Sequence, residues 1–181
     1  EHDLVDKLVF LYSGTHGLKH NPDFLAALAL RHKDDPRGRV VVNAAGSGLD
    51  ALRAEKEAKG IDNLLILGLQ PIDRFAEVLA TADVFAAVLE RDAGVFSVPS
   101  KVLSYLCAGR PILLAAPGEN LAARNVASAG CGEIVEPEDM TGWLAAADKL
   151  ARDPDLRTRQ GAAGRAFAEA NFSVGTVGDR F

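Results

Sequence analysis

The sequence lacks the residue patterns that hold metals or disulfides. Only two cysteines, Cys107 and Cys131, occur in 181 residues, and they form neither a CxxC pair nor a metal-ligand spacing. The four histidines show no HxH or HExxH spacing. We therefore expect two reduced, buried thiols in a cytoplasmic protein and no bound metal.

Three motifs that mark common enzyme classes are also missing. No GxxxxGK[ST] sequence is present, which argues against a P-loop nucleotide hydrolase. A GxGxxG fingerprint is absent too, because Gly46-Ser47-Gly48 supplies only its first half, and a lone GxG is more often a turn than a cofactor site. No GxSxG elbow supports serine-histidine-aspartate catalysis.

The charge balance and the hydrophobic pattern exclude two further classes. The 25 acidic residues exceed the 20 basic ones, and a net charge of −5 argues against a dedicated nucleic-acid binder. No apolar run approaches the ~20 residues that a membrane span needs, and no signal peptide is visible. The chain begins with Glu1 rather than methionine, so we expect a single domain, residues 1–181, excised from a longer protein.

Short apolar runs alternate with helix-like stretches along the whole chain. The runs at 40–42 and 64–67 do not alternate with polar residues, which is typical of parallel strands buried on both faces. Strands are expected at 7–13, 39–44, 64–67, 84–89, 112–115 and 132–135. Helices are expected at 22–32, from Gly48 through Lys59, from a cap at Asp73 past Leu79, and at 100–108, 120–129, 139–151 and 154–171.

This alternation predicts an α/β fold: a three-layer, Rossmann-like domain with a six-stranded parallel sheet. In such sheets ligands bind beyond the carboxyl ends of the strands, where loops lead into helix N-termini. Candidate site residues should therefore lie in the loops at that edge. These loops are expected at 14–21, 45–47, 68–73, 90–100 and 116–120.

The stretch from Asp92 to Leu113 carries the clearest indication of a ligand site. Ser100 is of a residue type that caps helices, and we expect the helix after it to end at Gly109. Its apolar face is expected to comprise Val102, Leu103, Leu106 and Cys107. Lys101 lies in the first turn, where a cation opposes the helix dipole. A phosphate in front of the helix N-terminus would explain a lysine at this position.

Other candidates have an ordinary explanation as well as a functional one. Lys19 and His20 follow a glycine-rich loop that leaves the first strand, where backbone N–H groups and cationic side chains can approach a phosphate. A solvated Lys-His pair before a helix explains them equally well. Asp92 can accept hydrogen bonds from sugar hydroxyls, although exposed loop aspartates are common. Ser104 supplies a hydroxyl to the core or to the rim of a site.

The central stretch also resembles a known family signature. Residues 99–112 read Pro-Ser-Lys, then Tyr105, then Ala-Gly-Arg-Pro-Ile. They resemble the PSKxxxYxxAGRPI signature of GT-B nucleotide-sugar glycosyltransferases, of the type called glycosyltransferase family four or glycosyl transferase group one. Three further segments are similar to the family in order and spacing: 12–22, 81–84 and 130–137. The resemblance covers essentially the whole chain, but only the carboxyl-terminal half of such an enzyme.

The resemblance implies a donor-binding domain, one half of the GT-B architecture. Such an enzyme transfers a sugar from a nucleotide diphosphate-sugar to an acceptor with retained configuration, and polysaccharide or glycoconjugate synthesis is the expected setting. The implied partners are the nucleotide-sugar donor and an N-terminal Rossmann-like domain, through which the enzyme can associate peripherally with a membrane. No cofactor or metal is implied, and the isolated half is expected to be inactive alone.

The resemblance further implies which residues touch the donor. The phosphates are expected to meet Gly14, Thr15, Lys19, His20, Val98, Pro99, Ser100 and Lys101. The nucleoside is expected to meet Gly46, Gln70, Pro71, Ile72 and Ser104. The sugar is expected to meet Asp92 and Gly94. No catalytic residue and no metal ligand are expected in this half.

The chain departs from the family pattern at three positions. Phe96 and Ser104 stand where many members carry the two glutamates of an E-x7-E arrangement, and Thr15 stands where an arginine is common. Glu90 or Asp92 is an alternative for the first glutamate. The donor base, the sugar and the acceptor therefore stay unassigned. Two alternatives remain: half of a nucleotide-sugar epimerase, and a non-catalytic Rossmann-like domain that mediates assembly.

Overall fold

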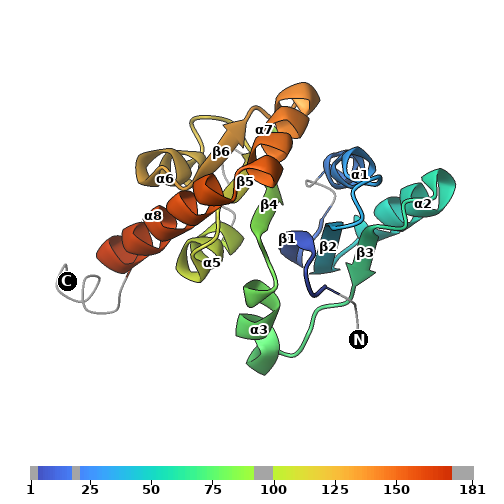
Figure 1. The fold of residues 1–181 in the computed structure, drawn as a ribbon, viewed down its shortest axis with the longest axis horizontal. Coiled ribbons are helices and arrows are strands. Elements are labelled where there is room, and N and C mark those ends of the chain that lie inside the picture. Colours follow the sequence, from blue (N-terminus) through green and yellow to red (C-terminus); the bar gives the residue numbers. More distant parts are fainter. Residues whose placement is uncertain (1–3, 18–20, 92–99, 173–181) are drawn as a thin grey trace.

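The computed structural model describes residues 4–17, 21–91 and 100–172 and shows one sheet with helices on both faces (Figure 1). Among these residues the sheet has six strands, all paired in parallel, in the order β3-β2-β1-β4-β5-β6. The strands are β1 (Leu8–Thr15), β2 (Gly38–Ala45), β3 (Leu64–Leu67), β4 (Val84–Val88), β5 (Ile112–Ala115) and β6 (Gly132–Val135). The predicted α/β fold is confirmed.

Helices cover the sheet in two layers (Figure 1). One layer comprises α1 (Pro22–Arg31), α2 (Leu49–Lys59) and α7 (Met140–Arg152). The other comprises α3 (Phe75–Ala80), which follows a short 3-10 turn η1 (Ile72–Arg74), together with α5 (Lys101–Ala108), α6 (Leu121–Ala129) and α8 (Pro154–Phe172). Each face of the sheet therefore has its own hydrophobic core.

Successive side chains of β1 enter the two different cores. Phe10 and Tyr12 are buried against the α1 and α7 side, whereas Val9 and Leu11 are buried against the α3 and α5 side. Alternate residues of a strand point to opposite faces, and both faces are covered here. For this reason the run that forms β1 is apolar throughout instead of alternating with polar residues.

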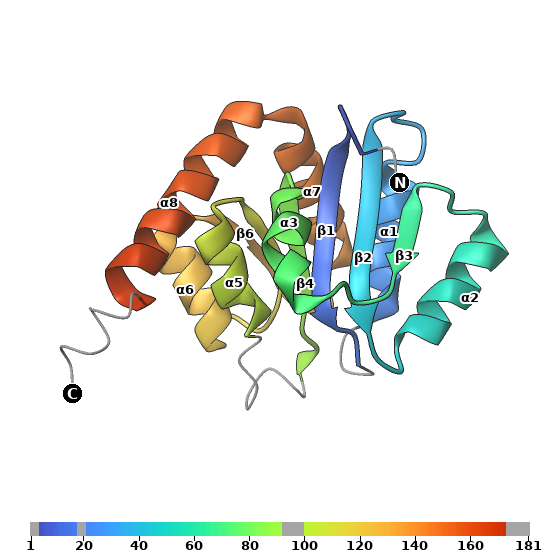
Figure 2. The ribbon, with the colours of Figure 1, turned by 90° about the horizontal axis from the view of Figure 1, so that it is seen from below.

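The strand order creates a switch point between β1 and β4. From β1 the chain adds β2 and β3 on one side, and from β4 it adds β5 and β6 on the other. The helices that follow β1 and β4 therefore cover opposite faces of the sheet, and ligands of open α/β sheets bind at the carboxyl edge beside such a switch point. In Figure 2 this edge is the lower one, and α5 begins close to it.

The buried face of α5 differs from the predicted one. Tyr105 is fully buried and stacks on Phe85, with ring centroids 4.0 Å apart and an interplanar angle of 4°. Leu103 and Cys107, which we expected to be buried, are exposed instead. The helix is rotated so that its aromatic residue enters the core, because a tyrosine ring buries more apolar area than a cysteine side chain. Cys131 is buried as expected, and this burial raises the pKa of its thiol to about 11.

Two predicted helix caps are wrong, although the helices are present. Ser100 precedes α5, but its backbone is already helical and its side chain makes no capping hydrogen bond. Asp73 lies inside η1, because Pro71, two residues earlier, occupies the cap position and accepts a hydrogen bond from the backbone N–H of Arg74 at 3.0 Å. The predicted cap at Gly109 is present, with a left-handed φ of 68°.

Within the described ranges, none of the helices combines the length and the apolarity that crossing a bilayer requires.

Candidate functional site

Lys101 lies at the carboxyl end of β1, beside Gly14 and Thr15. Its Nζ donates a hydrogen bond to the carbonyl oxygen of Thr15 at 3.1 Å, across 86 residues of sequence. Nζ also donates to the hydroxyl of Tyr12 and lies 3.7 Å from the centroid of the Tyr12 ring. A β-carbon built on Gly14 would come within 3.5 Å of Lys101 Cε. The fold therefore brings together three residues that we predicted separately as phosphate ligands.

The ammonium of Lys101 has no carboxylate to balance it among the described residues. No ion pair involves Lys101, and desolvation by burial lowers its pKa to about 7. Burial also raises the pKa of Tyr12, so its hydroxyl is neutral and donates to Thr15 O at 2.6 Å. Burying a cation among neutral groups lowers the free energy of unfolding, because the charge loses hydration without gaining a counter-charge. An anion at this position would offset that cost.

A chain of hydrogen bonds links the elements along the carboxyl edge. The backbone N–H of Ser13 donates to the Tyr105 hydroxyl at 2.9 Å, and this hydroxyl donates to Ser13 O at 3.1 Å. The Asn43 Nδ2 group donates to Ser13 Oγ at 3.0 Å, and the Gln70 backbone N–H donates to Asn43 Oδ1 at 3.3 Å. These bonds tie α5, β1, β2 and the segment after β3 to one another, so the N-terminus of α5 is held against the end of β1.

His16 packs against the glycine loop that follows β2. Its backbone N–H donates to Ala45 O at 2.8 Å, and the Gly48 N–H donates to His16 O at 3.0 Å. Gly46 has a φ of 133°, and a β-carbon there would lie 2.4 Å from His16 O. The packing of His16 therefore requires a glycine at position 46. That Gly46 also contacts the nucleoside stays a prediction.

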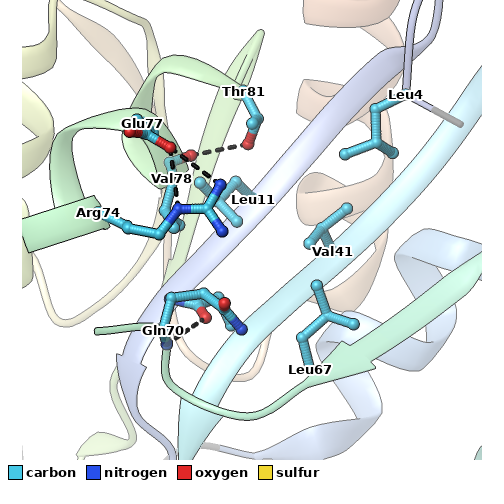
Figure 3. Close-up of a pocket in the computed structure, with 10 residues that line it drawn as sticks. Leu4, Leu11, Val41, Leu67, Gln70, Arg74, Glu77, Val78 and Thr81 are labelled. Carbon is cyan, nitrogen blue, oxygen red and sulfur yellow. Dashed lines mark hydrogen bonds and ion pairs between the residues drawn. The ribbon is translucent and has the colours of Figure 1, made fainter. Parts of the chain in front are cut away.

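Two of the predicted nucleoside residues, Gln70 and Ser104, line two different depressions that both border α3. Gln70 lines a cavity of about 500 Å³ on the face of β1, β2 and β3 that α3 borders (Figure 3). Ser104 lines a groove of about 450 Å³ between α3 and α5. Pro71 and Ile72 lie on the segment that leads into α3, and Ile72 is 86% exposed. The structure therefore places these four residues around α3, and Ser104 lines the groove on the α5 side of that helix.

The cavity in Figure 3 has an apolar floor and a polar rim. Leu11, Val41 and Leu67 supply the floor from the three strands, and Gln70 stands at one end. Arg74 and Glu77 form an ion pair at 3.0 Å on the α3 side. The arginine charge is thus already balanced within the rim, in contrast to that of Lys101.

Several predicted residues cannot be placed. Lys19, His20, Asp92, Gly94, Val98 and Pro99 lie outside the described residues. In the part of the chain that the structure describes, no group of histidine, cysteine, aspartate and glutamate side chains could hold a metal ion.

Sequence reasoning missed four residues that shape the site. Tyr12 and Tyr105 belong to segments that we had singled out, but their side chains had no assigned role. His16 lies in the loop predicted at 14–21 and Asn43 in the strand predicted at 39–44, but neither side chain was assigned a role. These residues could have been identified from the sequence, because each is a polar or aromatic residue near the carboxyl end of a predicted parallel strand or in a helix that follows one.

A family model described as "Glycosyl transferases group 1" matches residues 2–167. No curated protein matches the sequence. Many solved structures share the fold, although their sequence identities are low. HepE from Anabaena, solved in complex with UDP and glucose, has a TM-score of 0.80 and 14% identity; the alignment covers 98% of this chain and 47% of that one.

Two further solved structures show the same fold. The C-terminal domain of a glycosyl transferase group 1 family protein, LpcC from Francisella tularensis, has a TM-score of 0.75 and 16% identity, over 93% of this chain and 87% of that one. A TarM variant from S. aureus, solved with UDP and two sugar ligands, has a TM-score of 0.78 and 12% identity, over 97% of this chain and 34% of that one. The chain therefore spans less than half the length of HepE and TarM.

Proposed function

Because the chain belongs to the glycosyl transferases group 1 family, we propose that it is the donor-binding domain of a retaining glycosyltransferase. The donor is a nucleotide diphosphate-sugar, and the transferred sugar enters a polysaccharide or glycoconjugate. The observation that carries this proposal is the position of Lys101. This cation, which has no carboxylate partner within the described part of the chain, lies beside Gly14 and Thr15 at the switch point of the sheet.

The site supplies positive potential where the donor diphosphate would lie. The N-terminus of α5 contributes the positive end of its dipole, and the Ser100 side chain does not cap it. Lys101 adds a charged donor from the first turn of the same helix. Negative charge grows on the diphosphate as its bond to the sugar breaks, and donors held in place stabilise that charge without reorganisation. These groups can do so without a metal ion.

Binding of the acceptor requires a second domain in addition to the donor-binding one. The solved HepE and TarM chains are more than twice as long as the aligned part, which supports an additional domain. We assign to an N-terminal Rossmann-like domain the acceptor site and any peripheral contact with a membrane. The enzyme is expected to act in the cytoplasm. The 181-residue chain alone is then expected to bind nucleotide without transferring sugar.

Calorimetric titration of the chain with UDP, GDP and ADP tests this proposal. At least one of them should bind, and Lys101→Ala should weaken binding by about 10- to 100-fold, as for the loss of one hydrogen bond to a charged group. Lys7→Ala is the matched control, because Lys7 lies at the opposite end of β1 and donates to Pro36 O. If none of the three nucleotides binds at millimolar concentration, the proposal is wrong. Equal affinities of Lys101→Ala and the unmodified chain would favour an assembly role.

A further inference from the structure

Tyr12 contacts Lys101 Nζ through both its ring and its hydroxyl. We propose that Tyr12 is a positioning residue for the phosphate site, and that diphosphate binding drives the uptake of a proton by the Lys101 amine. This inference rests on the proposed function, because it requires that a diphosphate reaches Lys101. It adds a residue and a pH dependence that the family signature does not contain.

Tyr12 fixes the end of a side chain that is otherwise flexible. The Tyr12 ring is fully buried and supplies a surface 3.7 Å from Lys101 Nζ. The Tyr12 hydroxyl accepts from Nζ and donates to Thr15 O at 2.6 Å, and Thr15 O accepts from Nζ at 3.1 Å. Lys101 Nζ therefore has three contacts: the Tyr12 ring, the Tyr12 hydroxyl and the Thr15 carbonyl oxygen. A lysine that is already ordered loses less rotamer entropy when the ligand binds.

Among the described residues, the groups that contact the Lys101 amine carry no charge. From β1 these are Tyr12 and the Thr15 carbonyl; beyond Tyr12, the ring of buried His16 lies 5.2 Å from the Tyr12 ring. From α5 the nearest titratable group is Tyr105, whose pKa burial raises and whose hydroxyl bonds Ser13. The first turn of α5 contains no acidic residue. Within the described residues, no charge of either sign shifts the pKa of Lys101, and desolvation alone lowers it to about 7.

Binding of an anion opposes the effect of desolvation on the pKa of Lys101. At pH 8 most Lys101 side chains in the empty site carry a neutral amine. A diphosphate within hydrogen-bonding distance favours the ammonium form and raises the pKa of the amine. A proton therefore moves from the buffer to the Nζ lone pair as the ligand binds, and the ligand itself keeps all its bonds. The nucleotide affinity is therefore expected to be highest below pH 7. Above pH 7 it should fall by up to about tenfold for each pH unit.

The first experiment measures nucleotide affinity at pH 7, 8 and 9. The chain is titrated with UDP, GDP and ADP in two buffers of different ionisation enthalpy, which gives the number of protons taken up. The terminal phosphate of a nucleotide loses its last proton near pH 6, so changes above pH 7 belong to the protein. We expect an uptake close to one proton at pH 8. Lys101→Arg should show no such uptake and a flat profile, because a guanidinium stays charged throughout.

The second experiment separates the hydroxyl of Tyr12 from its ring. Tyr12→Phe keeps the ring in the core and should weaken binding at pH 7 by about 3- to 10-fold, with the fall in affinity shifted to lower pH, since the ammonium loses an acceptor. Tyr105→Phe is the matched control, because its hydroxyl bonds Ser13 rather than Lys101. Tyr105→Phe should leave unchanged the pH at which nucleotide affinity begins to fall. Tyr12→Leu also removes the ring, and a thermal melt shows whether this variant still folds.

The outcomes distinguish this inference from the proposed function. If no nucleotide binds the unmodified chain, both are wrong. If a nucleotide binds and Lys101→Ala weakens it, the proposed function stands. The inference is then overturned by an affinity that is constant from pH 7 to 9, or by a Tyr12→Phe chain that binds like the unmodified one at every pH. A misfolded Tyr12→Leu chain decides nothing by itself, because Tyr12→Phe supplies the test.

Discussion

The arginines at the amino edge of the sheet differ from Lys101 at the carboxyl edge in the partners that they meet. At the amino edge Asp148 binds two arginines, with Arg31 Nε 3.1 Å and Arg152 Nη2 3.2 Å from its carboxylate. Arg37 at the same edge lies 3.3 Å from a carboxylate oxygen of Asp35. At the carboxyl edge Lys101 contacts the hydroxyl and ring of Tyr12 and the carbonyl of Thr15, and it has no ion pair with any described residue.

The paired arginines stabilise the fold through a carboxylate, whereas Lys101 has no carboxylate partner among the described residues. The hydrogen bond from Arg31 holds the pKa of Asp148 below its usual range, so the pair favours the folded state at neutral pH. Lys101 has the reverse effect, since burial disfavours its charged form. A side chain that costs stability and lies at the switch point of a parallel sheet is a better functional candidate than any of the paired arginines.

The largest expected effect is a loss of stability when Gly46, in the loop after β2, is replaced. Gly46→Ala should lower the free energy of unfolding by about 2–4 kcal/mol, because it combines a disfavoured φ of 133° with a β-carbon 2.4 Å from His16 O. Urea denaturation measures the loss. Gly68→Ala is the control, since a β-carbon at Gly68 would have no neighbour within 4 Å. Equal stabilities of the two variants would show that the close packing around His16 is unimportant.

Replacing Lys101 should separate binding from stability. Lys101→Met should weaken nucleotide binding by at least about tenfold and raise the free energy of unfolding by about 1 kcal/mol at pH 7. In the unmodified chain the pKa of Lys101 is near 7 when folded and near its ordinary 10.5 when unfolded, so stability should rise between pH 7 and 10. Lys101→Met should remove that slope in urea denaturation. A variant that is less stable than the unmodified chain at pH 7 would contradict the comparison.

The opposite result is expected at the amino edge. Asp148→Asn should lower the free energy of unfolding by about 0.5–1 kcal/mol, because Arg31 and Arg152 lose their carboxylate. Nucleotide affinity should not change, since the site lies at the other edge. The contribution of Asp148 is complete above its unfolded pKa near 3.8 and disappears as the pH falls below it. Loss of nucleotide binding in Asp148→Asn would show that the two edges are coupled.

The smallest expected effect concerns His32 at the amino edge. Burial lowers the pKa of His32 below its ordinary 6.5, more than the neighbouring Asp148 raises it. Its stabilising contribution is complete above pH 6.5 and decreases as the pH falls, because the unfolded chain binds the proton more readily. His32→Gln should therefore flatten the stability between pH 7 and 5 by a few tenths of a kcal/mol, measured by urea denaturation. A steeper slope in the variant would contradict this assignment.

The fold could be predicted because its signals are local. The apolar runs of β1 and β2 and the glycine at the end of α5 each indicate their own structure. The caps at Ser100 and Asp73 failed because a capping residue type shows only that a helix can begin nearby. A proline or a neighbouring segment decides at which residue the helix begins.

The sequence alone was sufficient to predict the parallel sheet, and it led to the hypothesis of a site at the carboxyl edge that includes Lys101. These depend on apolar periodicity and on residues that are close along the chain. Only the tertiary structure decided that Lys101 rests on Tyr12 and Thr15 and that Tyr105 bonds Ser13, over 86 to 92 residues of sequence. Such contacts depend on strand order and on helix rotation, which are set by how the two cores pack.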